Sequence, residues 1–287
     1  MKKGRQIMYW IIGIFIFLIL GILIWFSIPY SPMKAEFAQL HNQQNSKMQI
    51  QNQVFKQEDI ADLPMPVQRY FEVCGFIGQP KMSNMKISHN DVDFILSSSM
   101  PKLKIKCTQF NSAEKPERVA LIDTHLYGIP FEGIDAYQAG VGSMKGVIAK
   151  GVTLFNQTGA AMNKSSLVNC LAESLFMPNF VLQDFVSWES IDENHVKGTI
   201  AYYGLYASGI FTFDKNGFLE TFTTDDRLYV DTNGNVKQVK WSAICGDYRE
   251  VNGIKQPKSL QAVWHLVEGD LVYFDGHDTF IQYNVAE

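Results

Sequence analysis

The chain has 287 residues, 46% of them hydrophobic, which is enough for a large folded core and excludes an intrinsically disordered protein. Its formal net charge is −4, and setting aside the three cationic residues Lys2, Lys3 and Arg5 leaves −7 for the remainder. An acidic remainder without a long Lys/Arg block argues against a nucleic-acid partner, because phosphate binding needs clustered positive charge.

Residues 7–28, IMYWIIGIFIFLILGILIWFSI, contain no charged residue and predict a transmembrane helix. Such a helix would be roughly 33 Å long, enough to cross a bilayer core of about 30 Å. Aromatic residues stand near both of its ends, where they prefer the membrane interface. Residues 1–6 are then expected to form a cytoplasmic tip, with the rest of the chain outside the cytoplasm as a single-pass protein of the cell membrane.

A cleaved signal peptide is the competing interpretation of this segment. Its apolar region would normally have about 7–15 residues and be followed by a small-x-small cleavage pattern. Here Met33 stands two positions before Ala35, and Glu36 two positions before Ala38, so the pattern is absent and we favour an uncleaved anchor. A single span also argues against a transporter or channel that acts alone.

Residues 29–57 are rich in Gln and Asn and predict a stalk or linker, which could be a tether or a weak helix, with an extracytoplasmic β-rich domain over residues 58–287. The domain should open with a short amphipathic helix in LPMPVQRYFEVCG, where Pro66 suits a first turn and Gly75 a stop. Its apolar face recurs at i, i+3, i+4 and i+7 and comprises Val67, Tyr70, Phe71 and Cys74.

The sequence then changes from helical to alternating periodicity. In KLKIKCTQF the apolar Leu103, Ile105 and Cys107 alternate with lysines, as in a half-buried antiparallel strand. Further strands are predicted at 85–97, 119–127 and 146–155, and many more follow residue 195, whereas 165–188 is the one extended helical stretch. GVGSMKG, 140–146, lacks a dinucleotide-binding context and is read as a bend between strands.

Two turns, DKNG at 214–217 and DTNG at 231–234, predict tight hairpins because Asn and Gly tolerate positive φ. The second also resembles the start of a calcium loop. That loop would need Gly and Glu where the chain has Val236 and Ser242, so no metal site is predicted there.

Motifs of nucleophilic, zinc and nucleotide-binding enzymes are absent, and the histidines are scattered, so we expect neither a metal nor a cofactor. The four cysteines are widely spaced, which leaves two disulfides or four buried thiols open, with a slight preference for thiols. They are Cys74, Cys107, Cys170 and Cys245.

Glu173 is the one carboxylate in the mostly apolar stretch SLVNCLAESLFMPNF, which we expect to be a central helix ending at Pro178. Three interpretations stay open: a solvated helix face, a buried ion pair, or a ligand-contacting or catalytic group. As partners in an ion pair, Arg69 and Arg227 are considered first, with Arg249 also available.

LPMPVQRYF at 63–71 and LAESLFMP at 171–178, with weaker matches at DDR (225–227) and PKSLQAVWHL (257–266), resemble an uncharacterised bacterial family of unknown function. Its members pair an L-P-x-P-V-Q-R-Y-F opening with a central L-A-E-x-x-x-x-P. The resemblance covers roughly residues 63–283 and brings no established activity. It does place Arg69 and Glu173 in recurring motifs.

Many short antiparallel strands with one helical interruption predict an α+β fold: a large twisted sheet or half-barrel with helices on one face, similar to lipoprotein-carrier folds. Trp188, Trp241 and Trp264 could line an apolar cleft in it, although core positions are the simpler interpretation. We therefore predict a membrane-tethered domain that binds an apolar or lipid-like envelope ligand. The alternatives are an envelope enzyme that uses Glu173 as acid or base, and a structural partner of another membrane protein.

Overall fold

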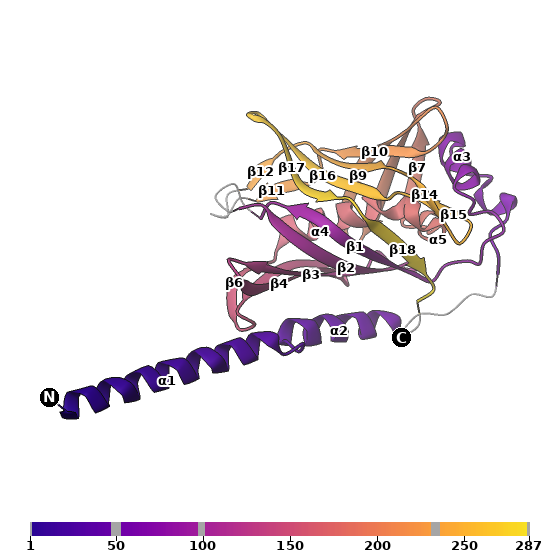
Figure 1. Ribbon diagram of the computed structural model, residues 1–287. Helices are drawn as coiled ribbons and strands as arrows, with labels where there is room; N and C mark the ends of the chain where they lie inside the picture. The colour runs from indigo at the N-terminus through magenta and orange to yellow at the C-terminus, as the bar shows by residue number, and fades with distance from the viewer. Residues whose placement is uncertain (1, 47–52, 97–100, 231–235, 286–287) are drawn as a thin grey trace.

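The computed structural model describes residues 2–46, 53–96, 101–230 and 236–285. It begins with helix α1 (Lys2–Ser27), which projects away from the folded body (Figure 1). The helical region from Lys3 to Asn45 contains an apolar window with a mean hydropathy of 3.0, none of it buried in the protein. By length and composition, this segment could cross a membrane.

Helix α2 (Pro32–Asn45) follows after a short break and lies along the sheet beside β3 and β4 (Figure 1). Its apolar positions Met33, Phe37 and Leu40 are spaced i, i+4, i+7 and pack against the outer side of the sheet, where Phe110 is buried. Within the segment 29–57, predicted to be a tether or a weak helix, residues 32–45 are therefore helical, and this spacing gives the helix an apolar face. Residues 47–52 of that stalk lie outside the described residues.

The short helix predicted after the stalk is confirmed as α3 (Met65–Val73), preceded by a 3-10 turn, η1 (Gln57–Ile60). Val67, Tyr70, Phe71 and Cys74 are all buried in the largest hydrophobic cluster. Gly75 adopts a φ of +80°, and its Cβ position is closed by the carbonyl of Gly253, so only glycine fits this stop.

One antiparallel sheet of fourteen strands forms the body, in the order β6-β5-β4-β3-β2-β1-β17-β16-β13-β10-β9-β8-β7, with β18 pairing the first half of β1. Two further two-stranded antiparallel sheets, β11–β12 and β14–β15, are separate from it. The strand bounds are β1 (Asn84–Phe94), β2 (Leu103–Ser112), β3 (Arg118–Leu126), β4 (Ile129–Gln138), β5 (Val141–Ile148), β6 (Val152–Gln157), β7 (Val186–Ser190), β8 (His195–Tyr202), β9 (Leu205–Phe213), β10 (Leu219–Thr224), β11 (Leu228–Val230), β12 (Val236–Gln238), β13 (Trp241–Gly246), β14 (Arg249–Val251), β15 (Ile254–Gln256), β16 (Ser259–Leu266), β17 (Gly269–Gly276) and β18 (Thr279–Tyr283).

Helix α4 (Ala160–Ala172) holds the two ends of this strand order close together, since it packs against β5 near one end and β9 near the other. A Cβ at Gly142 of β5 would collide with the carbonyl oxygen of Met162 in α4. A Cβ at Gly140, in the β4–β5 turn, would lie 2.7 Å from the Cβ of Tyr203 in the β8–β9 turn. The sheet therefore curls around α4, which confirms the predicted twisted sheet with helices on one face.

The single helix predicted over residues 165–188 is wrong in its extent. Helix α4 ends at Ala172, a 3-10 turn η2 (Ser174–Phe176) follows, and α5 (Pro178–Val181) is a separate short helix. Pro178 begins α5 and does not end α4. Helical geometry is disfavoured for the residue before a proline, and Met177 is extended with φ −140°, which separates η2 from α5.

The predicted turns and the strand next to them have different outcomes in the structure. The hairpin at Asp214–Gly217 is confirmed between β9 and β10, with Asp214 Oδ1 accepting from the N–H groups of Asn216 and Phe218. The predicted bend at 140–146 is confined to residues 139–140, and β5 begins at Val141. The predicted strand at 146–155 is instead the end of β5, a turn, and β6. The hairpin predicted at 231–234 falls outside the described residues.

Candidate functional site

A cavity of about 200 Å³ lies between the inner face of the sheet and the C-terminal end of α4. Residues of two hydrophobic clusters line the cavity. The cavity therefore lies between the cluster around α3 and α4 and the cluster beneath β2 and β3. The large apolar side chains in its wall include Ile87, Phe94, Ile122, Phe176, Phe222 and Phe274.

Small side chains leave this space open in an interior that is otherwise rich in aromatic rings. Ala243 of β13 and Ala262 of β16 are direct cross-strand partners, and both line the cavity. Ala120 and Ala172 line it as well. Protein interiors are close-packed, so four alanines around one space mark a place where the core is not filled.

A polar cluster occupies one part of the wall and is built around Glu173, the C-cap residue of α4. Its Oε2 accepts hydrogen bonds from Gln109 Nε2 at 2.6 Å and from Asn111 Nδ2 at 2.7 Å, both in β2. Arg118 Nε lies 3.6 Å from the same oxygen. The Glu173 side chain retains 22% of its exposure, so it borders the cavity without being sealed from it.

Arg118 lies between two carboxylates and is itself buried. It donates to Asp135 Oδ2 and to Gln109 Oε1, each at 2.8 Å, while its Nε has no hydrogen-bond partner. Burial opposes the charge of this group, but the carboxylates of Asp135 and Glu173 outweigh that effect and raise the pKa of Arg118. The cluster therefore holds two negative charges and one positive charge.

The partner of Glu173 is thus Arg118, and not one of the arginines considered from the sequence. Arg69, in α3, donates to Asn194 Oδ1 at 3.0 Å and lies against Gly217 of the β9–β10 turn. Arg249 pairs with Asp278 at 3.0 Å. The expected Arg69 pairing fails because α3 packs beside β8 and its arginine faces the adjoining turn.

Three tryptophans were considered as cavity residues, and the structure places Trp241 there. Trp264 stacks on Tyr273 with ring centroids 6.1 Å apart and forms the next layer outward. Trp188 belongs to β7, packs on Phe211 and donates to the carbonyl of Val181, away from the cavity. Arg227, also considered from the sequence, lines the cavity.

Gln109, Asn111, Arg118 and Asp135 are the site residues that sequence reasoning missed. The sequence of β2 contained an indication of this polar cluster. Gln109 and Asn111 continue the alternating positions of Leu103, Ile105 and Cys107, and this face of the strand is buried. Polar residues on a buried face need partners. That face therefore pointed to an interior polar cluster.

His89 also lines the cavity and is uncharged there. Its Nδ1 is 2.9 Å from the hydroxyl of Thr279. Burial, and secondarily the positive charge of Arg118, lowers the pKa of His89 to about 4. The four cysteines are free thiols whose pKa values burial raises, so they are not reactive thiolates.

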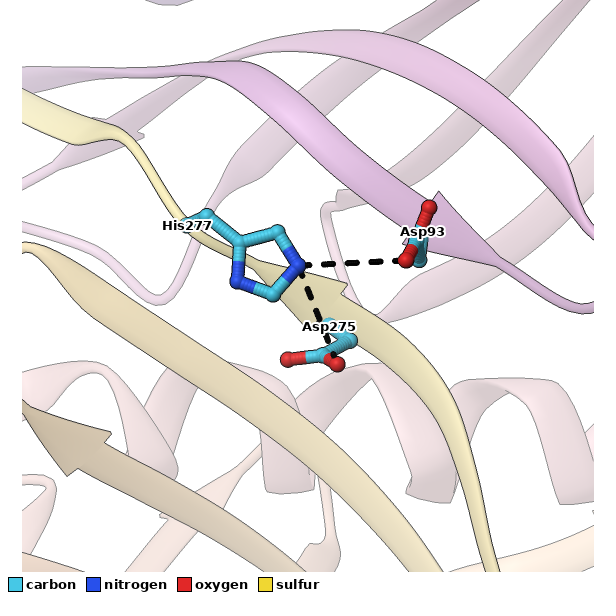
Figure 2. Close-up of side chains that lie close together, drawn as sticks. All are labelled: Asp93, Asp275 and His277. Carbon is cyan, nitrogen blue, oxygen red and sulfur yellow. Dashed lines mark ion pairs between the residues drawn. The ribbon is translucent and has the colours of Figure 1, made fainter.

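Asp93, Asp275 and His277 form a second group whose ligand atoms lie within 4.8 Å of one another. Figure 2 shows the His277 ring directed toward both carboxylates, with Nε2 at 3.9 Å from Asp93 and 3.8 Å from Asp275. Lys102 and Lys104 already pair with Asp93, at 3.2 and 2.9 Å. These lysines supply the positive charge that a metal ion would otherwise bring.

Comparison with known families gives a match over most of this body. The profile of a family described as "Family of unknown function (DUF6544)" matches residues 53–276. The chain belongs to this family. The DUF6544 region includes α3, α4 and the cavity, whereas α1 and α2 lie outside the matched range. No curated protein matches the chain.

Solved structures resemble the chain only loosely. A putative outer membrane lipoprotein-sorting protein domain from Vibrio parahaemolyticus has 9% identity and a TM-score of 0.38, covering 72% of this chain and 86% of that one. A LolA superfamily protein from Nitrosomonas europaea has 7% identity and a TM-score of 0.39, covering 77% and 93%. A DUF1329 family protein from Desulfovibrio piger has 11% identity and a TM-score of 0.37, covering 90% and 95%.

Proposed function

We propose that this protein is a membrane-tethered binding protein that holds the apolar part of a lipid-like envelope molecule in the cavity. Residues 7–28 would cross the membrane once, with the cationic N-terminus in the cytoplasm. Helix α2 and the domain from residue 58 onward would lie on the extracytoplasmic side. The observation that carries the proposal is the unfilled apolar cavity bordered by four alanines.

The contact between the folded body and the end of α1 supports this placement. Lys150, in the β5–β6 turn, donates to the backbone carbonyls of Trp25 at 2.9 Å and of Ile28. A cation bound to the last carbonyls of a helix also opposes the negative end of its dipole. The edge strand β6 beside this contact exposes Val152 and Leu154, at 58% and 44%. The body would therefore rest close to the membrane surface, where lipid-like molecules are found.

The volume limits the size of the ligand. Pockets for drug-sized ligands measure roughly 300–1,000 Å³, so a cavity of about 200 Å³ suits one apolar chain and not a whole two-chain lipid. For comparison, an engineered apolar cavity of about 150 Å³ binds benzene. We propose a single chain, or a single chain of a larger molecule, as the occupant.

The acid–base alternative for Glu173 has less support. A general acid or base needs an oxygen free to exchange a proton with the substrate. Oε2 of Glu173 already accepts two amide N–H groups and lies near Arg118, so this oxygen links α4 to β2 and leaves only Oε1 for proton exchange.

Equilibrium dialysis of radiolabelled decanol tests the proposal, with the full chain in lipid nanodiscs and empty nanodiscs as the blank. Ala262→Phe should fill the cavity and abolish saturable binding. Ala201→Phe introduces the same ring at an exposed position of β8 and should leave binding unchanged. Absence of saturable binding in the unmodified chain, or equal binding by the Ala262→Phe variant, would contradict the proposal.

A further inference from the structure

Arg227 differs from the other cationic groups near the cavity in the way it is held. It follows β10, lines the cavity, and its guanidinium carbon lies over three aromatic rings. Its Cζ lies 4.4 Å from the ring centroid of Trp241, 5.4 Å from that of Trp264 and 6.0 Å from that of Tyr273. Such rings attract a guanidinium through their quadrupoles and fix its plane.

The backbone beside Arg227 is also fixed. Its neighbour Asp226 accepts from Lys164 Nζ of α4 at 2.7 Å and from the N–H of Ser208 in β9, also at 2.7 Å. The loop after β10 is thereby tied to the central helix and to the sheet. Arg227 is therefore held by its loop as well as by its side chain.

No carboxylate pairs with Arg227 among the described residues. Arg118 and Arg249, by contrast, each pair with an aspartate at 3.0 Å or less. A guanidinium that stacks through its face keeps its N–H edge available, and that edge matches a carboxylate or phosphate. Arg227 thus presents an unused anion-binding edge at the wall of an apolar cavity.

The remaining charges of the cavity restrict where an anion could bind. The cluster of Glu173, Asp135 and Arg118 carries a net negative charge, and like charges repel at short range. His89, the other titratable cation in the wall, is neutral because burial lowers its pKa. Arg227 is therefore the position in this wall that favours an anion.

We infer that the cavity takes a single-chain amphiphile with an anionic head, a carboxylate or a phosphate, whose head binds Arg227 and whose tail lies between Phe222, Ala243 and Ala262. This inference rests on the proposed function, since it assigns the head group of the same ligand. The aromatic rings have two roles in binding: they orient the guanidinium for the head group, and they extend the apolar wall for the tail.

The experiment compares decanoate with decanol, which have the same chain length but different charge at neutral pH. Both are measured by equilibrium dialysis against the full chain in nanodiscs, with empty nanodiscs as the blank. The unmodified chain should bind decanoate about tenfold or more tightly than decanol, because a charge-assisted hydrogen bond is involved. Arg227→Gln should remove that preference, so that decanoate and decanol then bind the variant with affinities within about twofold of each other.

Two variants serve as controls. Arg227→Lys keeps the charge without the planar fork and should recover part of the preference for decanoate. Arg249→Gln removes an arginine that lies over Phe280 and pairs with Asp278, outside the cavity wall, and should leave the preference intact. Thermal unfolding without ligand checks that the variants are folded.

The possible outcomes separate the inference from the proposed function. If decanoate and decanol bind equally well in the unmodified chain, the cavity binds apolar chains but the assigned head group is wrong. If neither binds, the proposed function itself fails. Inorganic phosphate is added as a competitor, and displacement of decanoate by phosphate at equal concentration would overturn the inference in favour of a site for free anions.

Discussion

Gln109 Nε2 lies 2.6 Å from Glu173 Oε2, and this hydrogen bond joins strand β2 to the end of helix α4. Glu173 is the C-cap of that helix, where a negative charge is disfavoured by the helix dipole. The amides of Gln109 and Asn111, together with Arg118, stabilise the carboxylate at this position. The cavity wall therefore depends on a charged contact between helix and sheet.

Replacing Glu173 by Ala should lower the free energy of unfolding by about 1–3 kcal/mol, because the amides of Gln109 and Asn111 lose an acceptor and buried Arg118 loses a nearby carboxylate. Glu173→Gln should cost less, since it keeps the volume and one acceptor oxygen. Chemical denaturation of the full chain measures both values. Glu189→Ala, which removes a carboxylate that is 73% exposed in β7, is the matched control and should change stability very little. Equal stability of all three variants would mean that Glu173 is only solvated.

A substitution at Gly142 tests how closely α4 packs against β5. A Cβ at this position would collide with the carbonyl of Met162 and lie 2.6 Å from Ser166 Oγ, so Gly142→Ala should lower stability by about 1–3 kcal/mol. Gly151→Ala, in the neighbouring β5–β6 turn, meets nothing within 4 Å and should be neutral. Melting temperatures compare the two variants. A neutral Gly142→Ala would contradict the close approach of helix and strand.

His89 should make stability depend on pH between about 4 and 6.5. Its pKa is lowered to about 4 in the folded protein by burial and by Arg118, against about 6.5 when unfolded. Between these values the unfolded state binds more protons, so the free energy of unfolding rises with pH and is lost on acidification.

The test is denaturation of the full chain at pH 7 and at pH 5. The unmodified chain should lose about 2 kcal/mol more than His89→Gln over this interval. Glutamine cannot be protonated but can still hydrogen-bond Thr279. Parallel losses in the two proteins would show that His89 titrates normally. Carboxylates whose pKa is lowered, such as Asp278, affect stability only at lower pH.

The periodicity of apolar residues predicted individual strands and helices. The alternation of Leu103, Ile105 and Cys107 predicted β2, and the spacing of Val67, Tyr70 and Phe71 predicted α3. For α2 the sequence left a tether or a weak helix open, because its apolar face is short and surrounded by Gln and Asn. The packing of that face against the outer side of the sheet was not predicted.

The partner of Glu173 could not be read from the sequence for a different reason. Arg118 reaches the cluster because β2 and β3 pair with Asn111 opposite Arg118, and that register brings its side chain to Gln109 and Asp135. Register depends on the loop and on which face is buried, and neither follows from the residues of one strand alone. The sequence therefore gives no reason to choose Arg118 over Arg69, Arg227 or Arg249.

The central claim is that the cavity holds a lipid-like molecule, and native mass spectrometry of the full chain released from membranes tests it most directly. The account predicts a bound species with the mass of one amphiphile per chain in the unmodified protein, and its loss in Ala262→Phe but not in Ala201→Phe. A ligand-free mass for the unmodified chain in several independent preparations would contradict the account.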